Sequence, residues 1–430
     1  MKINSIKSSA PFDNIRSILR AEETHDPEVP GIVTSIIRDV RENGDAAVLK
    51  YTAKFDNLDR SSIAELRISR DEMAAAADQL DPELLGALQR AADNILVFHQ
   101  RQLERGFLDV FPDGSMLGQR VAPLARVGIY VPGGRASYPS SVLMNAVPAR
   151  VAGVDHITMV CPAFEGTTDP AVIAAAHVAG VDEIIRIGGA QAVAALAYGT
   201  ETIAPVDMIC GPGNKWVAEG KRQVFGRVNI DMIAGPSEIL VVADSTATAR
   251  HVAADMIGQA EHDPDAIAWL VTDNADLAAA VPAALDELLQ ANPRRDIARA
   301  SLENNGLIVV VDDIQAAAAV ADLRAPEHLE LLVAEPLQLA GRIRNAGAIF
   351  LGGYTPESVG DYYAGPNHIL PTGGTARWAS PLGVYDFVKR TSLLGYSRER
   401  LAAHGPDVIR LAESEHLFGH AEAVRVRTSI

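Results

Sequence analysis

Short apolar runs alternate with helical stretches through most of this 430-residue sequence, and no other feature constrains the fold as strongly. The first series of strand-like runs comprises residues 126–131, 156–161, 183–187, 207–210 and 228–231. Helical stretches such as residues 142–152 and 192–198 separate most of these runs. Strands that alternate with helices form a parallel sheet that is covered on both faces. The sequence therefore predicts an α/β fold.

A second series of strand-like runs follows the segment Gly235–Glu238 and comprises residues 239–243, 266–272, 307–311 and 348–351. Two sheets joined at crossings rich in glycine and proline predict two α/β domains, with a cleft between them where ligands usually bind. The first quarter of the chain is mostly helical. Its apolar spacing predicts one helix that Asn43-Gly44 ends, a second around residues 48–55, and a third from Asp81-Pro82.

Both ends of the chain depart from this pattern. Residues 1–25 form a polar N-terminal arm with few apolar anchors. The tail from Pro381 looks helical and is too short for a core of its own. We therefore expect the tail to dock on something larger, such as a partner subunit.

Composition excludes several functions. A formal net charge of −17 argues against nucleic-acid binding, because a phosphate backbone requires a basic surface. No apolar run approaches the roughly twenty residues that span a bilayer, and Met1–Phe12 lacks the apolar centre of a secretory signal. Cys161 and Cys210 read as reduced, buried thiols. We expect a cytoplasmic protein with no membrane or nucleic-acid partner.

Three glycine-rich turns follow directly on predicted strands, at residues 130–134, 188–191 and 211–214. Such turns let the backbone approach a phosphate and direct helix N-terminal amides toward it. None matches the dinucleotide fingerprint or the phosphate-loop motif, and an α/β protein needs tight turns in any case. A nucleotide site and a purely structural role both stay open here.

Glu327 and His328 stand side by side, after Pro326 and ahead of an apolar run. Adjacent residues on a helix do not face each other, so these two could serve different atoms of one ligand as separate proton-transfer groups. The alternative is a solvated helix start, because charged residues are usually exposed. Gln259 and His262 share a helix face, which fits either a metal site or a histidine that complements the helix dipole.

Two further segments concentrate ionisable residues. Asp361 and His368 fall in a predicted loop, where functional groups gather, although a turn-forming aspartate and a surface histidine are the alternative. The segment Glu413–His420 puts two carboxylates and two histidines on a predicted C-terminal helix. With no cysteine among these groups, a metal site built from them would be catalytic rather than structural. The residues point to a metal-dependent α/β enzyme, and their distance in sequence leaves open whether they meet in space.

In this order, these segments resemble the histidinol dehydrogenase family over nearly the whole chain. The resemblance begins at Asp39–Asp45 and continues through Val127–Gly134, Gly188–Ala192, Gly211–Asn214, Ala234–Glu238, Gln259–Pro264, Ala325–Leu331, Ser358–Thr372, Tyr385–Ser392 and Glu415–His420. A match of so many segments in the same order does not arise by chance.

This resemblance implies a zinc- and NAD-dependent enzyme that oxidises L-histidinol to L-histidinal and then to L-histidine, reducing two NAD in the last two steps of histidine biosynthesis. The implied ligands of one zinc ion per subunit are Gln259, His262, Asp361 and His420. Glu327 and His328 would be the acid/base pair, and Ser237, His368 and Glu415 would contact the substrate beside the zinc ligands. Tyr130, Gln191 and Asn214 would line the NAD site.

The family fold implies a homodimer of two incomplete Rossmann-like domains with parallel sheets, which exchanges small helical N- and C-terminal elements. We expect an N-terminal arm (1–25), a first domain with the metal and catalytic residues (26–129 and 239–381), a second domain on the NAD side (130–238), and a tail (382–430) that docks on the partner. Glu415 and His420 would then complete the partner's active site.

Two residues near the C-terminus depart from the family pattern. Position 416 is His where the family more often has glycine, and Glu413 adds a second candidate carboxylate beside Glu415. The alternative enzyme is a related zinc- and NAD-dependent dehydrogenase of another small alcohol. A non-catalytic nucleotide-binding regulator would have lost Glu327 or His328, and both are present.

Overall fold

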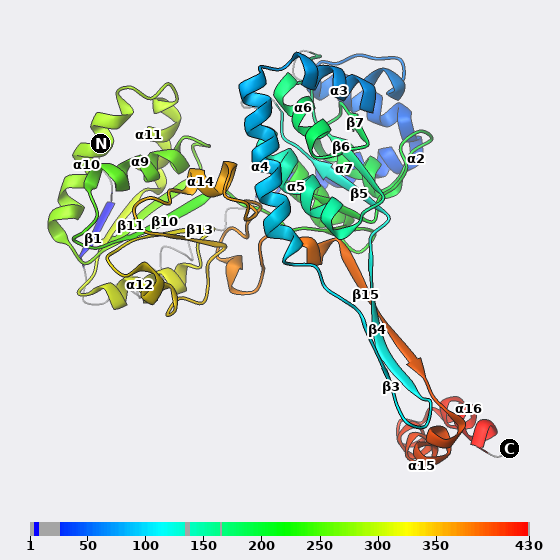
Figure 1. The fold of residues 1–430 in the computed structure, drawn as a ribbon. Coiled ribbons are helices and arrows are strands. Elements are labelled where there is room, and N and C mark those ends of the chain that lie inside the picture. The colour runs from blue at the N-terminus through cyan, green and yellow to red at the C-terminus, as the bar shows by residue number, and fades with distance from the viewer. Residues whose placement is uncertain (1–3, 8–25, 134–137, 164–165, 429–430) are drawn as a thin grey trace.

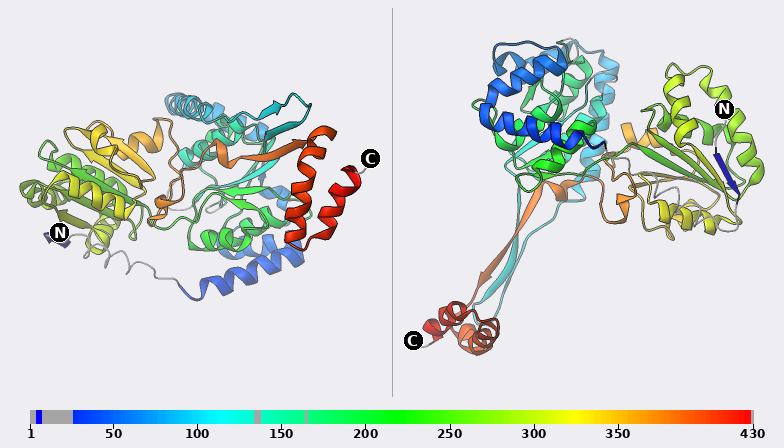
Figure 2. Two further views of the ribbon diagram at one scale, coloured as in Figure 1. Left: turned by 90° about the horizontal axis from the view of Figure 1, so that it is seen from below. Right: turned by 180° about the vertical axis from the view of Figure 1, so that it is seen from behind.

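The computed structural model describes residues 4–7, 26–133, 138–163 and 166–428. Two α/β lobes lie side by side, and a long β-arm extends from one of them and ends in a pair of helices (Figure 1). Figure 2 shows from two further sides that the C-terminus lies at the far end of this arm. The expected N-terminal arm falls mostly outside the described residues, and its described part, residues 4–7, is a strand rather than a helix.

Lobe 1 is built on a six-stranded, all-parallel sheet. Its strands follow the order β1 (Asn4–Lys7), β12 (Leu307–Val310), β11 (Ile267–Thr272), β10 (Glu238–Ala243), β13 (His328–Leu332) and β14 (Ala348–Leu351). One face packs against α9 (Ala249–Ala260), α10 (Ala275–Leu289) and α11 (Arg295–Asn305), and the other against α12 (Ile314–Arg324) and α13 (Pro336–Ala340). The short helix α14 (Glu357–Tyr362) lies against α9. Both faces of the sheet are therefore buried, as the sequence predicts.

Lobe 2 is built on a second six-stranded sheet. Its strands follow the order β2 (Arg67–Ile68), β7 (Glu183–Ile185), β6 (His156–Val160), β5 (Arg126–Tyr130), β8 (Met208–Cys210) and β9 (Asn229–Ile230), and all but β2 run parallel. One face packs against α3 (Arg70–Gln79), α4 (Pro82–Gln100), α5 (Pro139–Ala152) and α6 (Pro170–Val178). The other face packs against α2 (Val29–Asp56), α7 (Gly189–Tyr198) and α8 (Lys215–Val224). The strand order reverses between β5 and β8, the position at which such sheets bind ligands.

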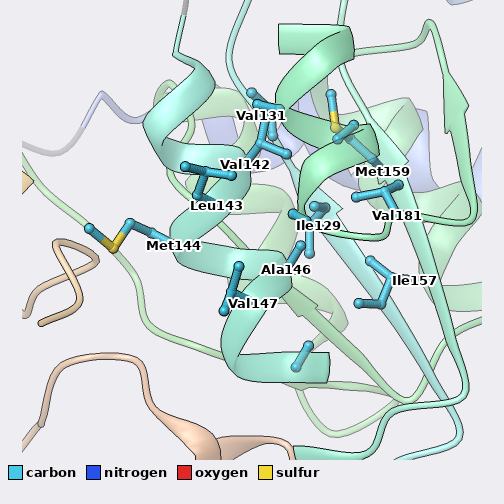
Figure 3. Close-up of a cluster of buried hydrophobic side chains, with 14 of the residues drawn as sticks. Ile129, Val131, Val142, Leu143, Met144, Ala146, Val147, Ile157, Met159 and Val181 are labelled. Atoms are coloured by element: carbon cyan, nitrogen blue, oxygen red, sulfur yellow. The ribbon is translucent and has the colours of Figure 1, made fainter. Parts of the chain in front are cut away.

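Lobe 2 has an apolar core on each face of its sheet. Figure 3 shows Val142 and Ala146 of α5 pointing toward Ile129 of β5, with Ile157 and Met159 of β6 beyond it. Leu143 and Val147 project from another side of α5 and are buried in the same cluster. Helix α2 contributes Val33, Ile37 and Val40 to the opposite face. Residues 29–100 thus pack on the sheet of lobe 2, whereas we expected residues 26–129 to belong with residues 239–381. Hydrophobic spacing identified these helices but could not show which sheet they cover.

Gly44 breaks helix α2 at the expected position. Its backbone adopts φ 49° and ψ −129°, a conformation that a side chain disfavours, and a Cβ there would clash with the carboxylate of Glu201. The kink is held because the Asp45 amide donates to Glu201 Oε2 at 2.7 Å, and the Thr202 hydroxyl donates to Asp45 at 2.8 Å. These bonds tie the kink to the loop after α7.

The arm is an antiparallel three-stranded sheet in the order β15 (Val388–Gly395), β4 (Met116–Pro123) and β3 (Phe107–Val110). It carries α15 (Arg398–Ser414) and α16 (Phe418–Thr428), which pack on each other away from both lobes (Figure 1). Leu394, Leu411 and Phe418 leave well over half of their side chains exposed. The expectation of an entirely helical tail is wrong, because eight of its residues form the strand β15.

Two smaller expectations have clear outcomes. Cys161 and Cys210 are both buried free thiols, as predicted. In the part of the chain that the structure describes, helices fall short of the length and apolar character needed to cross a membrane. Short 3₁₀ turns at Ile63–Leu66, Thr375–Arg377 and Val384–Asp386 complete the chain.

Candidate active site

A buried polar layer lies on the α9 face of the sheet in lobe 1. Strand β13 places Leu329 and Leu331 on the α12 face, so its alternate residues His328 and Glu330 point the other way. Helices α9 and α14 supply further polar side chains, in pairs one helical turn apart: Asp255 and Gln259 from α9, and Glu357 and Asp361 from α14. Three elements thus bring polar residues together in a layer that would otherwise be apolar core.

His328 lies at the centre of this layer and is 4% exposed. Its Nδ1 lies 3.1 Å from the carbonyl oxygen of Glu238, and since a carbonyl can only accept, Nδ1 donates. Nε2 lies 3.6 Å from Asp361 Oδ1 and has no hydrogen-bond partner among the described residues. In the neutral ring, Nε2 then carries the lone pair and can accept a proton from a ligand.

Glu327 is held by the start of strand β10. Its Oε2 accepts from the backbone amide of Glu238 at 2.9 Å, and it lies 3.7 Å from His328 Nδ1. The Glu238 carboxylate pairs with the buried guanidinium of Arg324 and accepts from the backbone amide of Gly373 at 3.0 Å. Glu327 and His328 are therefore buried at the N-terminal end of strand β13. The interpretation of this segment as a solvated helix start is wrong.

The metal-ligand candidates Gln259, His262 and Asp361 gather on one side of this layer. With the Gln259 amide turned so that its hydrogen bonds are satisfied, its nitrogen donates to Glu357 Oε1 and to the Glu238 carbonyl, each at 3.2 Å. The same nitrogen lies 3.1 Å from His328 Nδ1, which donates to the Glu238 carbonyl and therefore does not accept from Gln259. Its oxygen then faces His262, 3.5 Å from Nδ1. His262 and Asp361 both line a cavity of about 280 Å³, whose opposite wall is Tyr138–Ser140 of lobe 2. The cavity lies between the lobes, where the sequence predicts a cleft.

Glu357 is a site residue that the sequence interpretation missed. His328, Glu357 and Asp361 each present a ligand atom within 4.8 Å of the other two. Glu357 lies 3.7 Å from His328 Nδ1, and its backbone amide donates to Glu330 at 2.6 Å. Its spacing of four residues before Asp361, on one helix face, was the signal that could have found it. Imidazole, carboxylate and amide oxygen donors together suit a divalent metal ion.

Burial and crowding of carboxylates shift the acidities of this layer. Burial raises the pKa of Glu327 to about 8 and that of Glu357 to about 8. Burial lowers the pKa of His328, but the carboxylates of Glu357, Glu327 and Asp361 outweigh it and hold that pKa well above its usual value. Burial raises the pKa of Asp361, yet the adjacent His328 lowers it overall. This excess of acidic groups around one imidazole favours a bound cation.

The substrate candidates in lobe 1 lie close to the layer. His368 Nδ1 donates to the backbone carbonyl of Asp361 at 2.9 Å, and its Nε2 lies 3.5 Å from the hydroxyl of Ser141 on α5. Burial lowers the pKa of His368, which keeps the ring neutral. Ser237 is half-buried and directly precedes Glu238. These residues belong to the same region as His328.

Glu415 and His420 lie elsewhere. Glu415 lies between α15 and α16, and His420 lies on α16. Both residues are exposed, at the far end of the arm (Figure 1). The structure of one chain therefore does not bring them to His328. His416 between them adopts φ 59°, the left-handed conformation that favours glycine, which accounts for the glycine more usual at this position.

The three cofactor candidates line one cavity of about 780 Å³ in lobe 2. Part of its wall comes from the carboxyl ends of four strands: Tyr130 at the end of β5, Pro162 after β6, Gln191 after β7 and Asn214 after β8. The Tyr130 hydroxyl accepts from the Gly189 amide at 3.1 Å, and Asn214 caps α8 through the amides of Trp216 and Val217. Gln191 is 1% exposed, and neither atom of its amide has a hydrogen-bond partner among the described residues. A ligand could supply those partners.

Known proteins resemble this chain along its whole length. The family model described as histidinol dehydrogenase matches residues 19–428. Histidinol dehydrogenase of Syntrophotalea carbinolica is 53% identical over 427 residues, which cover 99% of each chain, and that of Geobacter sulfurreducens is 50% identical over 95% of each. The crystal structure of histidinol dehydrogenase from Elizabethkingia anophelis superposes with a TM-score of 0.92 at 36% identity, covering 99% of this chain and 98% of the other.

Proposed function

The chain belongs to the histidinol dehydrogenase family, and we propose that the cleft between its lobes oxidises L-histidinol to L-histidine through L-histidinal, with two NAD and one zinc ion. The protein is an oxidoreductase of histidine biosynthesis. One observation supports the chemistry most directly: the Nε2 atom of the buried His328 lies 3.6 Å from the Asp361 carboxylate and has no hydrogen-bond partner in the described part of the chain.

The proposed metal ligands of one chain are Gln259, His262 and Asp361, with Glu357 beside them. These residues suit a zinc ion because an amide oxygen, an imidazole and carboxylates converge at a place where acidic groups outnumber cations. Bound there, zinc would hold the amine and imidazole nitrogens of the substrate and so orient it. Gln259 contributes an oxygen because its nitrogen is engaged by Glu357 and the Glu238 carbonyl.

His328 and Glu327 take different protons in this proposal. With a bound cation balancing the surrounding carboxylates, the pKa of His328 would fall back toward its usual value and the ring would be neutral. Its Nε2 then accepts the proton of the substrate hydroxyl, while its Nδ1 donates to the Glu238 carbonyl. Glu327 accepts a proton from the water that adds to the aldehyde, giving the hydrate that is oxidised in the second step. Burial of both groups excludes bulk water from the reactive aldehyde.

NAD would occupy the cavity of lobe 2. Its volume of about 780 Å³ and its place at the carboxyl ends of parallel strands, beside the reversal of strand order, favour a dinucleotide. Tyr130, Gln191 and Asn214 would contact it, and the cofactor supplies the hydride acceptor.

The site of one chain would be completed by a second copy. His420 and Glu415 of the partner subunit would reach the layer around His328, because the arm holds these residues away from their own lobes. The exposed apolar side chains Leu394, Leu411 and Phe418 on the arm support burial against another chain.

The stoichiometry of NADH tests the proposed reaction. Zinc-loaded protein receives limiting L-histidinol and excess NAD, and NADH absorbance is followed to completion. We expect two NADH per histidinol. One NADH would refute the second oxidation, and none would refute the proposed substrate.

A further inference from the structure

Asp56, the last residue of helix α2, forms part of the wall of the cavity in lobe 2. It stands beside a wall of side chains from the same helix, among which Ile32 and Phe55 are 42% and 50% exposed. Tyr130 and Pro162 lie on other walls of the cavity. Asp56 therefore combines a carboxylate with an apolar surface at one place in the cavity.

The carboxylate of Asp56 lacks the partners that a structural aspartate normally has. Its Oδ2 is buried, and no described residue offers it a hydrogen bond. Lys54, a cation on the same wall, lies instead over the ring of Phe55, 5.1 Å from the centroid. Burial raises the pKa of Asp56 to about 6, which reflects the cost of holding this charge without compensation. Buried polar groups in folded proteins are nearly always paired, and exceptions often mark ligand sites.

We propose that Asp56 accepts hydrogen bonds from the ribose hydroxyls of the adenosine half of the dinucleotide and thereby selects NAD over NADP. A flat base can cover the exposed Ile32 and Phe55, and its ribose then presents two adjacent hydroxyl donors to one carboxylate. NADP carries a phosphate on the 2′ oxygen, which cannot donate and repels the carboxylate. This inference rests on the proposed use of NAD, which is tested separately.

The test uses the full-length, zinc-loaded protein and direct binding by calorimetry. NAD, NADP, adenosine 5′-monophosphate and adenosine 2′,5′-bisphosphate are titrated into the wild type, Asp56→Ala and Asp56→Asn. Asp59→Asn is the matched control, because Asp59 is exposed and lies outside the cavity lining. Thermal unfolding of each cofactor-free variant is measured in parallel.

Loss of a charged hydrogen bond should weaken NAD binding to Asp56→Ala about 10- to 100-fold. The preference for NAD over NADP, and for the 5′-monophosphate over the 2′,5′-bisphosphate, should fall at least about tenfold in both Asp56 variants. Asp59→Asn should match the wild type. Because Asp56→Asn removes an uncompensated buried charge and keeps the shape, the cofactor-free Asn variant should melt at or above the wild-type temperature.

The outcomes separate the two ideas. If the wild type does not bind NAD, the proposed cofactor is wrong. If the wild type binds NAD selectively and both Asp56 variants keep that selectivity, the role of Asp56 is overturned. The same holds if NAD affinity falls with no change in discrimination, or if Asp56→Asn melts well below the wild type, since either result indicates a structural role.

Discussion

Replacing Arg324 by methionine should unfold lobe 1 at a much lower temperature. Arg324 is 3% exposed and pairs with the carboxylate of the buried Glu238. The same carboxylate accepts hydrogen bonds from the backbone amides of Glu327 and Gly373. Removing one partner of a buried ion pair leaves a charge without compensation and costs about 3–5 kcal/mol. For a lobe of this size, each kcal/mol shifts Tm by about 2–4 °C, so the expected loss is about 6–20 °C.

The matched control is Arg250→Met, in the same lobe. Arg250 pairs with Glu287 at 2.5 Å, but both side chains are more than 60% exposed. Breaking such a pair costs about 0–1 kcal/mol, and Tm should fall by at most about 4 °C. Differential scanning calorimetry of both variants gives the comparison directly.

A double variant makes the reasoning refutable. Adding Glu238→Gln to Arg324→Met removes the orphaned charge while an amide oxygen can still accept from Gly373, so at least half of the lost Tm should return. If Arg324→Met melts like the Arg250 control, or if the double variant melts no higher than Arg324→Met, the buried pair does not support Glu327 as argued.

Three further predictions concern the proposed site and the arm. An inactive His328→Ala chain mixed with an inactive His420→Ala chain should regain partial activity after subunit exchange; heterodimers that form and stay inactive would disprove a shared site. The pKa of Glu327 is raised from 4.5 to about 8 in the folded protein, so between these pH values the folded state holds a proton that the unfolded state has lost. The free energy of unfolding of the metal-free protein should therefore fall as pH rises from about 5 to 8. Glu327→Gln should flatten that slope in thermal melts, and an unchanged slope would assign it to other groups. His416→Gly should stabilise the arm by about 1 kcal/mol by relieving the left-handed φ of 59°, and chemical denaturation that shows a loss instead would contradict the strain.

Most of the parallel strands were predictable because they are short apolar runs bounded by turn residues. The apolar composition of the run Ile239–Ala243, for example, predicts a strand, and strand β10 contains all five of its residues. Strand β13 was missed because it is not a continuous apolar run. Its sequence His328–Leu332 alternates polar and apolar residues, and the polar ones are buried against α9 and α14 rather than solvated. Local sequence does not show burial of charges, because that depends on partners far along the chain.

The structure brings some of the predicted site residues together and leaves others apart. Gln259, His262 and Asp361 do converge on one side of His328, which the family resemblance implied and residue spacing alone left open. Glu357 was missed because the segment around Asp361 was predicted to be a loop, whereas residues 357–362 form helix α14 and put the two carboxylates on one face. Glu415 and His420 cannot be placed from one chain, since their proposed contacts lie in another.

The connections between the lobes have a mechanical consequence. One described connection passes through Gly235 and another through Thr372, and the Gly235 amide donates to the Thr372 hydroxyl at 2.6 Å. The next residue, Gly373, is bonded to Glu238, while Asn367 on the same connection donates to the Met144 carbonyl of α5 at 2.7 Å. We expect two tethers that are fastened to each other and to both lobes to favour bending about one axis. Bending about that axis changes the width of the cleft and leaves the lobes in the same lateral alignment, so each closure would return the hydride donor and acceptor to the same line of approach.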